Sequence, residues 1–263
     1  TQRAALARQS GRYRGIGVAM YLEATGGTPE EAADFSFADD GTLTVTLGTQ
    51  DGGQAHAEAF SALVATELKL PQSRIRIVEG DSDVVRGGGS VGSRSTTAAA
   101  SVIERGSNEV LARATRLAAE TLEVVPADLG FADGVFTVVG TDRTIALGTL
   151  ICAHWRERSL YVKATHAPTF PNGCHIAEGE IDGATGAASV VRYTAVDEVG
   201  TVLNRPAVEG QVLGGIAQGV GQVLSENVVF DAGQLLTASF MDYAMPRAAN
   251  VPTVTVVHHG VPA

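Results

Sequence analysis

Lysine is almost absent from this chain. Lys69 and Lys163 are its only lysines, and the net charge of the 263 residues is −10. Such a balance provides no basic face, which argues against non-specific binding of nucleic acids. Cysteine is equally scarce, and Cys152 and Cys174 alone form no disulfide framework, so we expect a reducing, cytoplasmic location. No apolar run approaches about 18 residues, so we expect no membrane span.

Glycine and apolar residues are abundant instead. The 31 glycines and the 44% of apolar residues describe a globular protein with many tight turns. Its length suits one large domain or two small ones. The first 14 residues are polar and lack the apolar core of a secretory signal. The chain does not begin with Met and stops soon after an alternating run, so we expect it to be a piece of a longer polypeptide.

Hydrophobic periodicity predicts an α+β fold. Alternation predicts strands at residues 16–23, 34–38, 42–47, 74–78, 129–131, 135–139, 144–146, 174–182, 188–199, 228–230 and 253–257. Helical spacing predicts helices at residues 55–70, 96–122, 148–155 and 205–224. Glycine-containing turns at residues 39–41 and 183–186 predict two hairpins.

Two parts of the chain follow the same order of hairpin, Gly-Gln pair and helix. The pairs are Gly53 with Gln54 and Gly210 with Gln211. This similarity favours two similar subdomains, each a mixed sheet with a helix. The predicted organisation is a polar segment at residues 1–14, a first subdomain at 15–150 and a second, truncated subdomain at 151–263.

Residues 48–56 form a glycine-rich connection between a predicted strand and a predicted helix. Small residues let a backbone approach a ligand closely, and the N–H groups that begin a helix bind anions. An ordinary turn capped by Asp51 or Gln54 explains the pattern equally well. His56 alone is more typical of a capping or packed histidine than of a catalyst.

Residues 87–96 combine four glycines, an arginine and several hydroxyls at the start of the longest predicted helix. This is a better anion site than residues 48–56, although no Lys follows Gly92 as a P-loop requires. A flexible loop with a serine cap is the alternative. Neither pattern alone decides between a binding loop and a plain connection.

Residues 210–221 have apolar helical spacing but contain five glycines, each costing about 1 kcal/mol against alanine inside a helix. We expect close packing against a backbone or a ligand to offset this cost. Gln211 and Gln218 are seven residues apart and share a face. Zinc ligands at Cys152, His154, Cys174 and His175 are a weak alternative, because neighbours in a strand point to opposite faces.

Several of these stretches, taken together, resemble one family. They are residues 48–56, 92–96, 171–178, 208–219 and 240–247. They are similar to the molybdopterin-binding large subunit of the molybdenum hydroxylases, the family of xanthine dehydrogenase, aldehyde oxidase and the carbon monoxide dehydrogenase large chain. The resemblance covers nearly all of the chain from about residue 15.

The resemblance implies a fold of the molybdenum-cofactor-binding-domain type and a molybdenum ion held by the dithiolene of molybdopterin, often extended as a cytosine dinucleotide. No side chain ligates the metal in this family, and the resemblance implies no catalytic residue within this chain. By position, the cofactor-binding residues are Gly53, Gln54, Ala55, His56, Gly92, Ser93, Arg94, Ser95, Thr96, Gln211, placed near the metal, and Gln218. The implied partners are the remainder of the molybdenum subunit, iron–sulfur and FAD subunits and a small-molecule substrate; homo-oligomerisation is left open.

The family hydroxylates aldehydes, purines and related electron-poor carbons with oxygen from water, helped by a glutamate base. That glutamate belongs beyond residue 263 and part of the substrate funnel precedes this chain, so we expect the chain by itself to be inactive. Ala55 replaces a usual glycine, which is mild if its φ is negative. Arg205 stands where the family has proline. The competing interpretation is an inactive nucleotide- or anion-binding module.

Overall fold

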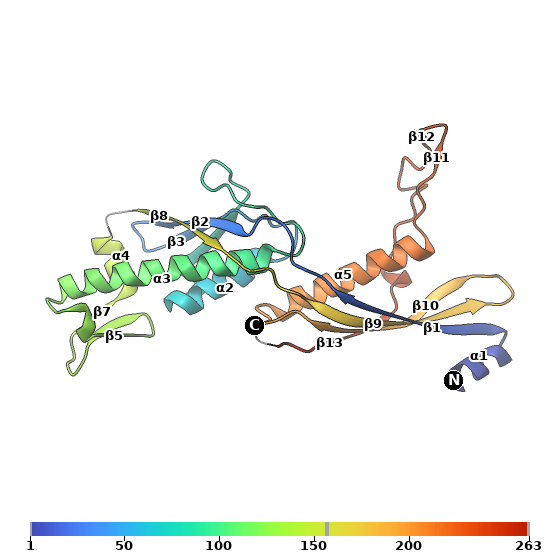
Figure 1. Ribbon diagram of the computed structural model, residues 1–263, viewed down its shortest axis with the longest axis horizontal. Helices are drawn as coiled ribbons and strands as arrows, with labels where there is room; N and C mark the ends of the chain where they lie inside the picture. Colours follow the sequence, from blue (N-terminus) through green and yellow to red (C-terminus); the bar gives the residue numbers. More distant parts are fainter. Residues whose placement is uncertain (1, 156–157, 262–263) are drawn as a thin grey trace. The chain divides into compact units, whose positions relative to one another are not determined.

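The computed structural model describes residues 2–155 and 158–261, so the outer ends of the predicted segments 1–14 and 151–263 lie outside the described residues. The chain forms two compact units (Figure 1). We call Ala24–Thr169 the inner unit, and Thr1–Glu23 with Phe170–Ala263 the outer unit. Both combine mixed sheets with helices, which confirms the predicted α+β class.

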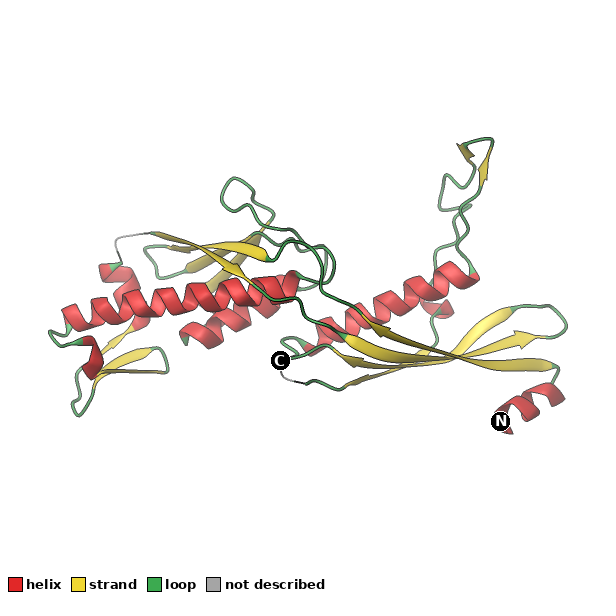
Figure 2. Ribbon diagram, in the orientation of Figure 1, coloured by secondary structure: helices red, strands yellow, loops and turns green. Residues whose placement is uncertain are grey.

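The inner unit is organised around a four-stranded sheet. Its order is β4 (Ile75–Glu79), β3 (Leu43–Leu47), β2 (Glu30–Phe37) and β8 (Ser159–Thr165). β2 pairs antiparallel with β3 and β8, whereas β3 and β4 are parallel. The chain passes from β3 to β4 through α2 (His56–Leu68) and η1 (Gln72–Arg74). α2 and the long helix α3 (Ser95–Thr121) cover one face of the sheet (Figure 2).

Alternate side chains of three strands build the core of the inner unit. Phe35, Val45 and Leu160 occupy register positions on the face that α2 and α3 cover, and all three are buried. Phe60 and Val64 of α2 are fully buried against them. A smaller sheet of β5 (Leu129–Ala132), β6 (Val135–Val138) and β7 (Thr144–Ala146) follows α3 and η2 (Pro126–Asp128), and α4 (Leu147–His154) ends this part.

The outer unit also contains a four-stranded mixed sheet. Its order is β1 (Arg12–Leu22), β9 (Asn172–Asp182), β10 (Ala188–Glu198) and β13 (Thr253–His258). β9 pairs antiparallel with β1 and β10, and β10 is parallel to β13. α5 (Arg205–Leu224) packs on this sheet through the small buried cluster of Ala195, Ile216 and Val220. The remaining elements are α1 (Gln2–Gln9), β11 (Phe230–Asp231), β12 (Gln234–Leu235) and η3 (Ala248–Asn250).

Both predicted hairpins and the helix at residues 205–224 are confirmed. The strand predicted at 228–230 is β11, at Phe230–Asp231, and β8, α1 and β12 were not predicted. The units divide at residues 23/24 and 169/170 rather than at 150/151, because β8 pairs with β2 and β1 pairs with β9. Within the described residues, no helix is long and apolar enough to cross a membrane.

Candidate cofactor site

Two glycine-rich loops of the inner unit lie against each other. The first loop (residues 48–55) connects β3 to α2, and the second loop (residues 87–94) leads into α3. Gly89 N–H donates to the Gly48 carbonyl at 3.2 Å. Ser90 Oγ donates to the Gln50 carbonyl at 2.6 Å and accepts from Gln50 N–H at 2.8 Å. The joined loops stand at the carboxyl ends of the parallel strands β3 and β4, where α/β proteins usually bind ligands.

The loops cross where Gly48 meets Gly87. A Cβ atom on either glycine would overlap the Cα atom of the other and the carboxylate of Glu31. Only glycine permits this approach, so the two glycines are required by packing rather than by a turn. Glu31 lies on β2, outside both glycine-rich motifs, and nothing in its local sequence marks it as part of the site.

The buried side chain of Arg94 anchors the second loop. Its side chain and that of Glu31 are both 0% exposed, with Nη1 2.8 Å from Glu31 Oε2. The same guanidinium donates to the carbonyls of Thr28, Glu30 and Gly89 at 3.1, 3.1 and 2.7 Å. A buried charge that satisfies its donors in this way is structural. Arg94 therefore has no free surface for a ligand, although it was predicted as a cofactor-binding residue by its position.

Hydroxyl groups at the start of α3 are available to a ligand. Ser93, Ser95 and Thr96 make no side-chain hydrogen bond to any described residue. The N-cap of α3 is Arg94, which provides no side-chain cap, so the serine cap of the alternative interpretation is not observed. The first N–H groups of a helix have no partner inside it, and together with these hydroxyls they suit an anion such as a phosphate.

Asp51 accepts three hydrogen bonds from backbone N–H groups at the end of the first loop and the start of α2. Its Oδ1 accepts from the N–H groups of Gly53 and Gln54 at 2.7 Å each, and its Oδ2 accepts from His56 N–H at 3.0 Å. Burial opposes ionisation, but these three backbone hydrogen bonds outweigh it and lower the pKa of Asp51. The capping alternative is thus observed for Asp51. Gln54 Oε1 accepts from Gly52 N–H, and its amide nitrogen has no partner among the described residues.

Ala55 adopts a left-handed conformation, with φ 61° and ψ 38°. The expectation of a mild replacement depended on a negative φ, so that condition is not met. The methyl group costs about 1–2 kcal/mol in this region of backbone space. The first loop therefore carries backbone strain at Ala55.

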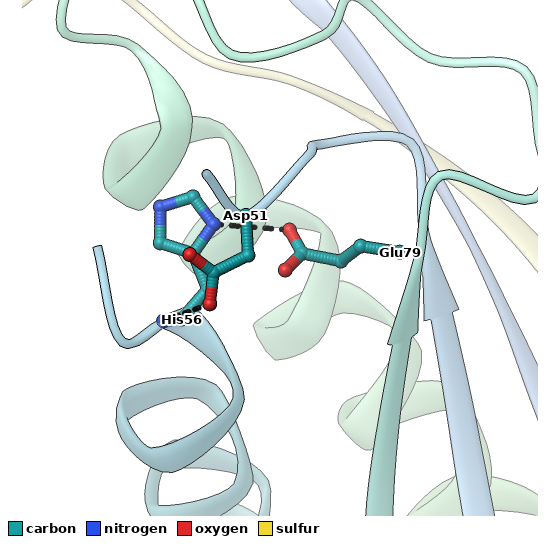
Figure 3. Close-up of side chains that lie close together, drawn as sticks. All are labelled: Asp51, His56 and Glu79. Carbon is teal, nitrogen blue, oxygen red and sulfur yellow. Dashed lines mark hydrogen bonds and ion pairs between the residues drawn. The ribbon is translucent and has the colours of Figure 1, made fainter. Parts of the chain in front are cut away.

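His56 is a packed histidine. It is 5% exposed, its ring stacks on Phe60 with centroids 4.9 Å apart, and its Nδ1 lies 3.1 Å from Glu79 Oε1 (Figure 3). Thr49 Oγ1 donates to the same carboxylate oxygen. Glu79, at the end of β4, is a further residue that the sequence motifs did not indicate.

Asp51, His56 and Glu79 form the one group of three metal-ligand types found among residues 2–155 and 158–261, with ligand atoms within 4.8 Å of one another. Protein hydrogen atoms already occupy these oxygens, so we assign the group to a hydrogen-bond network. The zinc alternative has no such group in the described ranges. His175 instead uses Nε2 toward Asp197 at 2.9 Å and Nδ1 toward the Tyr193 hydroxyl at 3.1 Å.

Gln211 and Gln218 belong to the outer unit, on α5, and both are exposed. A Cβ atom at neighbouring Gly214 or Gly215 would meet nothing within 4 Å. Of the five glycines in residues 210–221, Gly221 packs closely, against Glu226 and Pro246, whereas the packing expected for the other four is not found within the described residues. Gln218 lines an open cavity of about 670 Å³ together with Gly215, Gly219, Gln222, Glu226, Asn227, Val228 and Tyr243.

The chain matches the model of the molybdopterin cofactor-binding domain over residues 1–252. It belongs to this family. It is 32% identical over 260 residues to the gamma subunit of the 6-hydroxypseudooxynicotine dehydrogenase complex of Paenarthrobacter nicotinovorans, covering 94% of this chain and 33% of that protein. It is 31% identical over 274 residues to the carbon monoxide dehydrogenase large chain of Hydrogenophaga pseudoflava, covering 95% of this chain and 34% of that protein.

Solved structures agree with the family match. Quinoline 2-oxidoreductase from Pseudomonas putida 86 superposes with a TM-score of 0.89 at 31% identity, over 100% of this chain and 37% of that chain. The Cu,Mo-CO dehydrogenase gives 0.87 at 28% identity, over 99% of this chain and 36% of that chain. These matches confirm the predicted membership of the molybdenum hydroxylase large subunits. The chain spans about a third of the length of these relatives.

Proposed function

We propose that the joined loops of the inner unit hold molybdopterin, in its cytosine dinucleotide form, and that the complete protein is a molybdenum hydroxylase. Its substrates are aldehydes, purines or related electron-poor carbons, and water is the oxygen source. The observation that carries this proposal is the joining of residues 48–55 to residues 87–94 beside the start of α3. That surface offers the unpartnered hydroxyls and helix N–H groups that an anionic dinucleotide requires.

The residues divide this task between direct contacts and support. The N–H groups of the first turn of α3, with Ser93, Ser95 and Thr96, bind phosphate oxygens. The amide nitrogen of Gln54 donates to the end of the cofactor that carries the metal. Arg94 acts indirectly, because its guanidinium is buried against Glu31. When bound, the cofactor supplies the redox centre that accepts the electrons of the substrate.

The assignment extends to residues of the outer unit and to partners. By its position in the family, Gln211 belongs near the metal, and Gln218 belongs among the cofactor-binding residues. The electrons leave through iron–sulfur clusters and FAD on other subunits, in a cytoplasmic complex. The relatives are named for a nicotine derivative, carbon monoxide and quinoline, which are different substrates. We therefore propose no narrower substrate class than that of the family.

Metal and pterin analysis of the full-length protein, purified with its natural partners, tests this function. We expect about one molybdenum and one pterin per chain, as for a stoichiometric cofactor. Acid hydrolysis should release cytidine monophosphate, and H₂¹⁸O should label the hydroxylated product. Replacing Ser93, Ser95 and Thr96 together by alanine should lower the cofactor content. Thr121→Ala, an exposed position at the other end of α3, is the matched control.

Each outcome separates the interpretations. Bound molybdopterin with labelled product supports the hydroxylase. A nucleotide without molybdenum would support the inactive binding module, and stoichiometric zinc would support the zinc-stabilised domain. A triple variant with the cofactor content of the Thr121→Ala control would remove the start of α3 from the site.

A further inference from the structure

Glu79 connects the two ends of the first loop. It is the last residue of β4 and pairs in register with Leu47, the last residue of β3. One of its oxygens, Oε1, accepts a hydrogen bond from Thr49 and lies 3.1 Å from His56 Nδ1. Thr49 follows directly after Gly48 at the start of the loop, and His56 begins α2 at its end. A single carboxylate therefore fixes where the loop leaves the sheet and where it enters the helix.

The contacts of Glu79 are protected from water. Its side chain is 7% exposed, that of His56 is 6% exposed, and Thr49 is buried. Hydrogen bonds to an ionised group are roughly twice as strong as neutral ones, and a low-dielectric surrounding strengthens them further. Figure 3 shows Glu79 beside the ring nitrogen of His56 and Asp51 beside its backbone nitrogen, so two carboxylates hold this residue at different atoms.

The strained backbone of Ala55 requires such support. Residues in sparsely populated conformations persist only where the surrounding structure over-determines them. Ala55 lies between Gln54 and His56, and Asp51 accepts from the N–H groups of both. Asp51 is exposed and holds only the backbone, whereas Glu79 anchors the buried side chains that flank the loop. Without Glu79, only the backbone hydrogen bonds of the exposed Asp51 support Ala55 and Gln54, and the side chains that flank the loop lose their anchor.

We propose that Glu79 is a positioning residue that presents Gln54 to the cofactor through Thr49 and His56. This inference rests on the proposed function. Glu79 touches no ligand itself, and its effect passes through the conformation of residues 49–56. Loss of a supporting residue of this kind typically lowers metal-centre affinity about 10–100-fold.

The test compares two substitutions in the full-length protein with its partners. Glu79→Ala removes both hydrogen bonds, whereas Glu79→Gln keeps an oxygen acceptor but loses the charge. Glu58→Gln is the matched control, because Glu58 is an exposed acid in the first turn of α2 without a side-chain contact among the described residues. Molybdenum and pterin are measured per chain after dialysis. Amide hydrogen exchange of residues 49–56 is measured on cofactor-free protein.

We expect Glu79→Ala to retain about 10-fold less cofactor and to exchange the amides of Gly53, Gln54 and His56 about 10-fold faster, in the range of supporting residues at metal centres. Glu79→Gln should recover most of both properties, and Glu58→Gln should match the wild type. Wild-type exchange and retention in Glu79→Ala would overturn the inference. If the wild type holds no molybdopterin, the proposed function fails, while exchange still decides whether Glu79 orders the loop.

A conservative variant covers the case in which Glu79→Ala fails to fold. Thr49→Val preserves shape and removes only the hydroxyl that donates to Glu79. We expect faster exchange at the start of the loop and weaker cofactor retention, with a small fall in the thermal midpoint, because a buried carboxylate loses one hydrogen bond. Exchange identical to the wild type in Thr49→Val would also contradict the proposal.

Discussion

The inner and outer units contain the same succession of hairpin, crossover helix and parallel strand, but they bury very different amounts of apolar surface. β2, β3, α2 and β4 in the inner unit correspond to β9, β10, α5 and β13 in the outer unit. A strand distant in sequence, β8 or β1, completes each sheet. The inner unit encloses a large core under two helices, whereas the core cluster in the described part of the outer unit has three buried apolar residues.

The Gly-Gln pairs differ between the units as well. Gly53 and Gln54 lie in the loop before α2, but Gly210 and Gln211 lie inside α5. The predicted equivalence of the two pairs therefore does not hold in position, although the order of strands and helices does. The same order of elements therefore occurs in two settings. In the inner unit it surrounds a large buried core with a loop before its helix, and in the outer unit its helix carries glycines on an exposed face. The difference lies in what covers each sheet and each loop.

Breaking an ion pair in each unit should give the largest contrast. Arg94→Met leaves Glu31 buried without a partner, which typically costs about 3–5 kcal/mol. Arg3→Met removes an exposed pair with Glu178 in the outer unit, worth less than about 1 kcal/mol. Chemical unfolding of the full-length protein, followed by hydrogen exchange in α3 and β9, measures both. Equal effects at the two sites would contradict the assignment of Arg94 to a supporting role.

Adding one methyl group to a glycine should have opposite signs in the two long helices. A Cβ atom at Gly106 of α3 would overlap the buried ring of Phe35, and such overpacking costs about 1–3 kcal/mol. A Cβ atom at Gly215 of α5 meets nothing, so Gly215→Ala should stabilise the isolated chain by about 0.5–1 kcal/mol. Thermal unfolding of both variants is the measurement. In the full-length protein Gly215→Ala should lower cofactor content, and an unchanged content would separate α5 from the site.

Sequence reasoning reached the hairpins and α5 because their signals are local. A glycine turn at residues 39–41 and apolar spacing along residues 205–224 determine these elements almost alone. β8 carried an equally clear signal, since Leu160, Val162 and Ala164 alternate with exposed residues. This strand was not predicted. Because β8 pairs with β2, its omission placed the boundary at 150/151 instead of 169/170.

The site was predictable only in part. The glycine loops were recognisable as motifs, but the crossing of Gly48 and Gly87 depends on the register of two parallel strands. Glu31 and Glu79 belong to no local pattern, because their partners are distant in sequence: Glu31 pairs with Arg94, and Glu79 contacts Thr49 and His56. The left-handed conformation of Ala55 was not predicted, since alanine gives no sign of it.

Relieving strain in the first loop should have a smaller effect than the glycine substitutions in the helices. Ala55→Gly removes a left-handed penalty of about 1–2 kcal/mol but adds chain entropy of about 0.5–1 kcal/mol. We expect a net gain of a few tenths to about 1 kcal/mol in unfolding free energy, with cofactor retained. The matched control is Ala57→Gly, one residue inside α2, which should destabilise because it lies in the helix. A loss of stability in Ala55→Gly would show that the loop is not strained there.

The exposed strand of the outer unit should respond to charge with almost no change in stability. Val18 and Met20 of β1 are 64% and 82% exposed, and Val18 pairs with Ile176 on the face opposite the α5 contacts. An apolar surface of this kind promotes association. We therefore expect the isolated chain to self-associate in light scattering.

Val18→Lys with Met20→Lys should abolish this self-association while changing the unfolding free energy by less than about 0.5 kcal/mol, as is usual for exposed positions. Thr66→Lys, which adds a charge to an exposed polar position of α2, should leave association unchanged. Association that persists in the double variant would mean that another surface of the chain drives it.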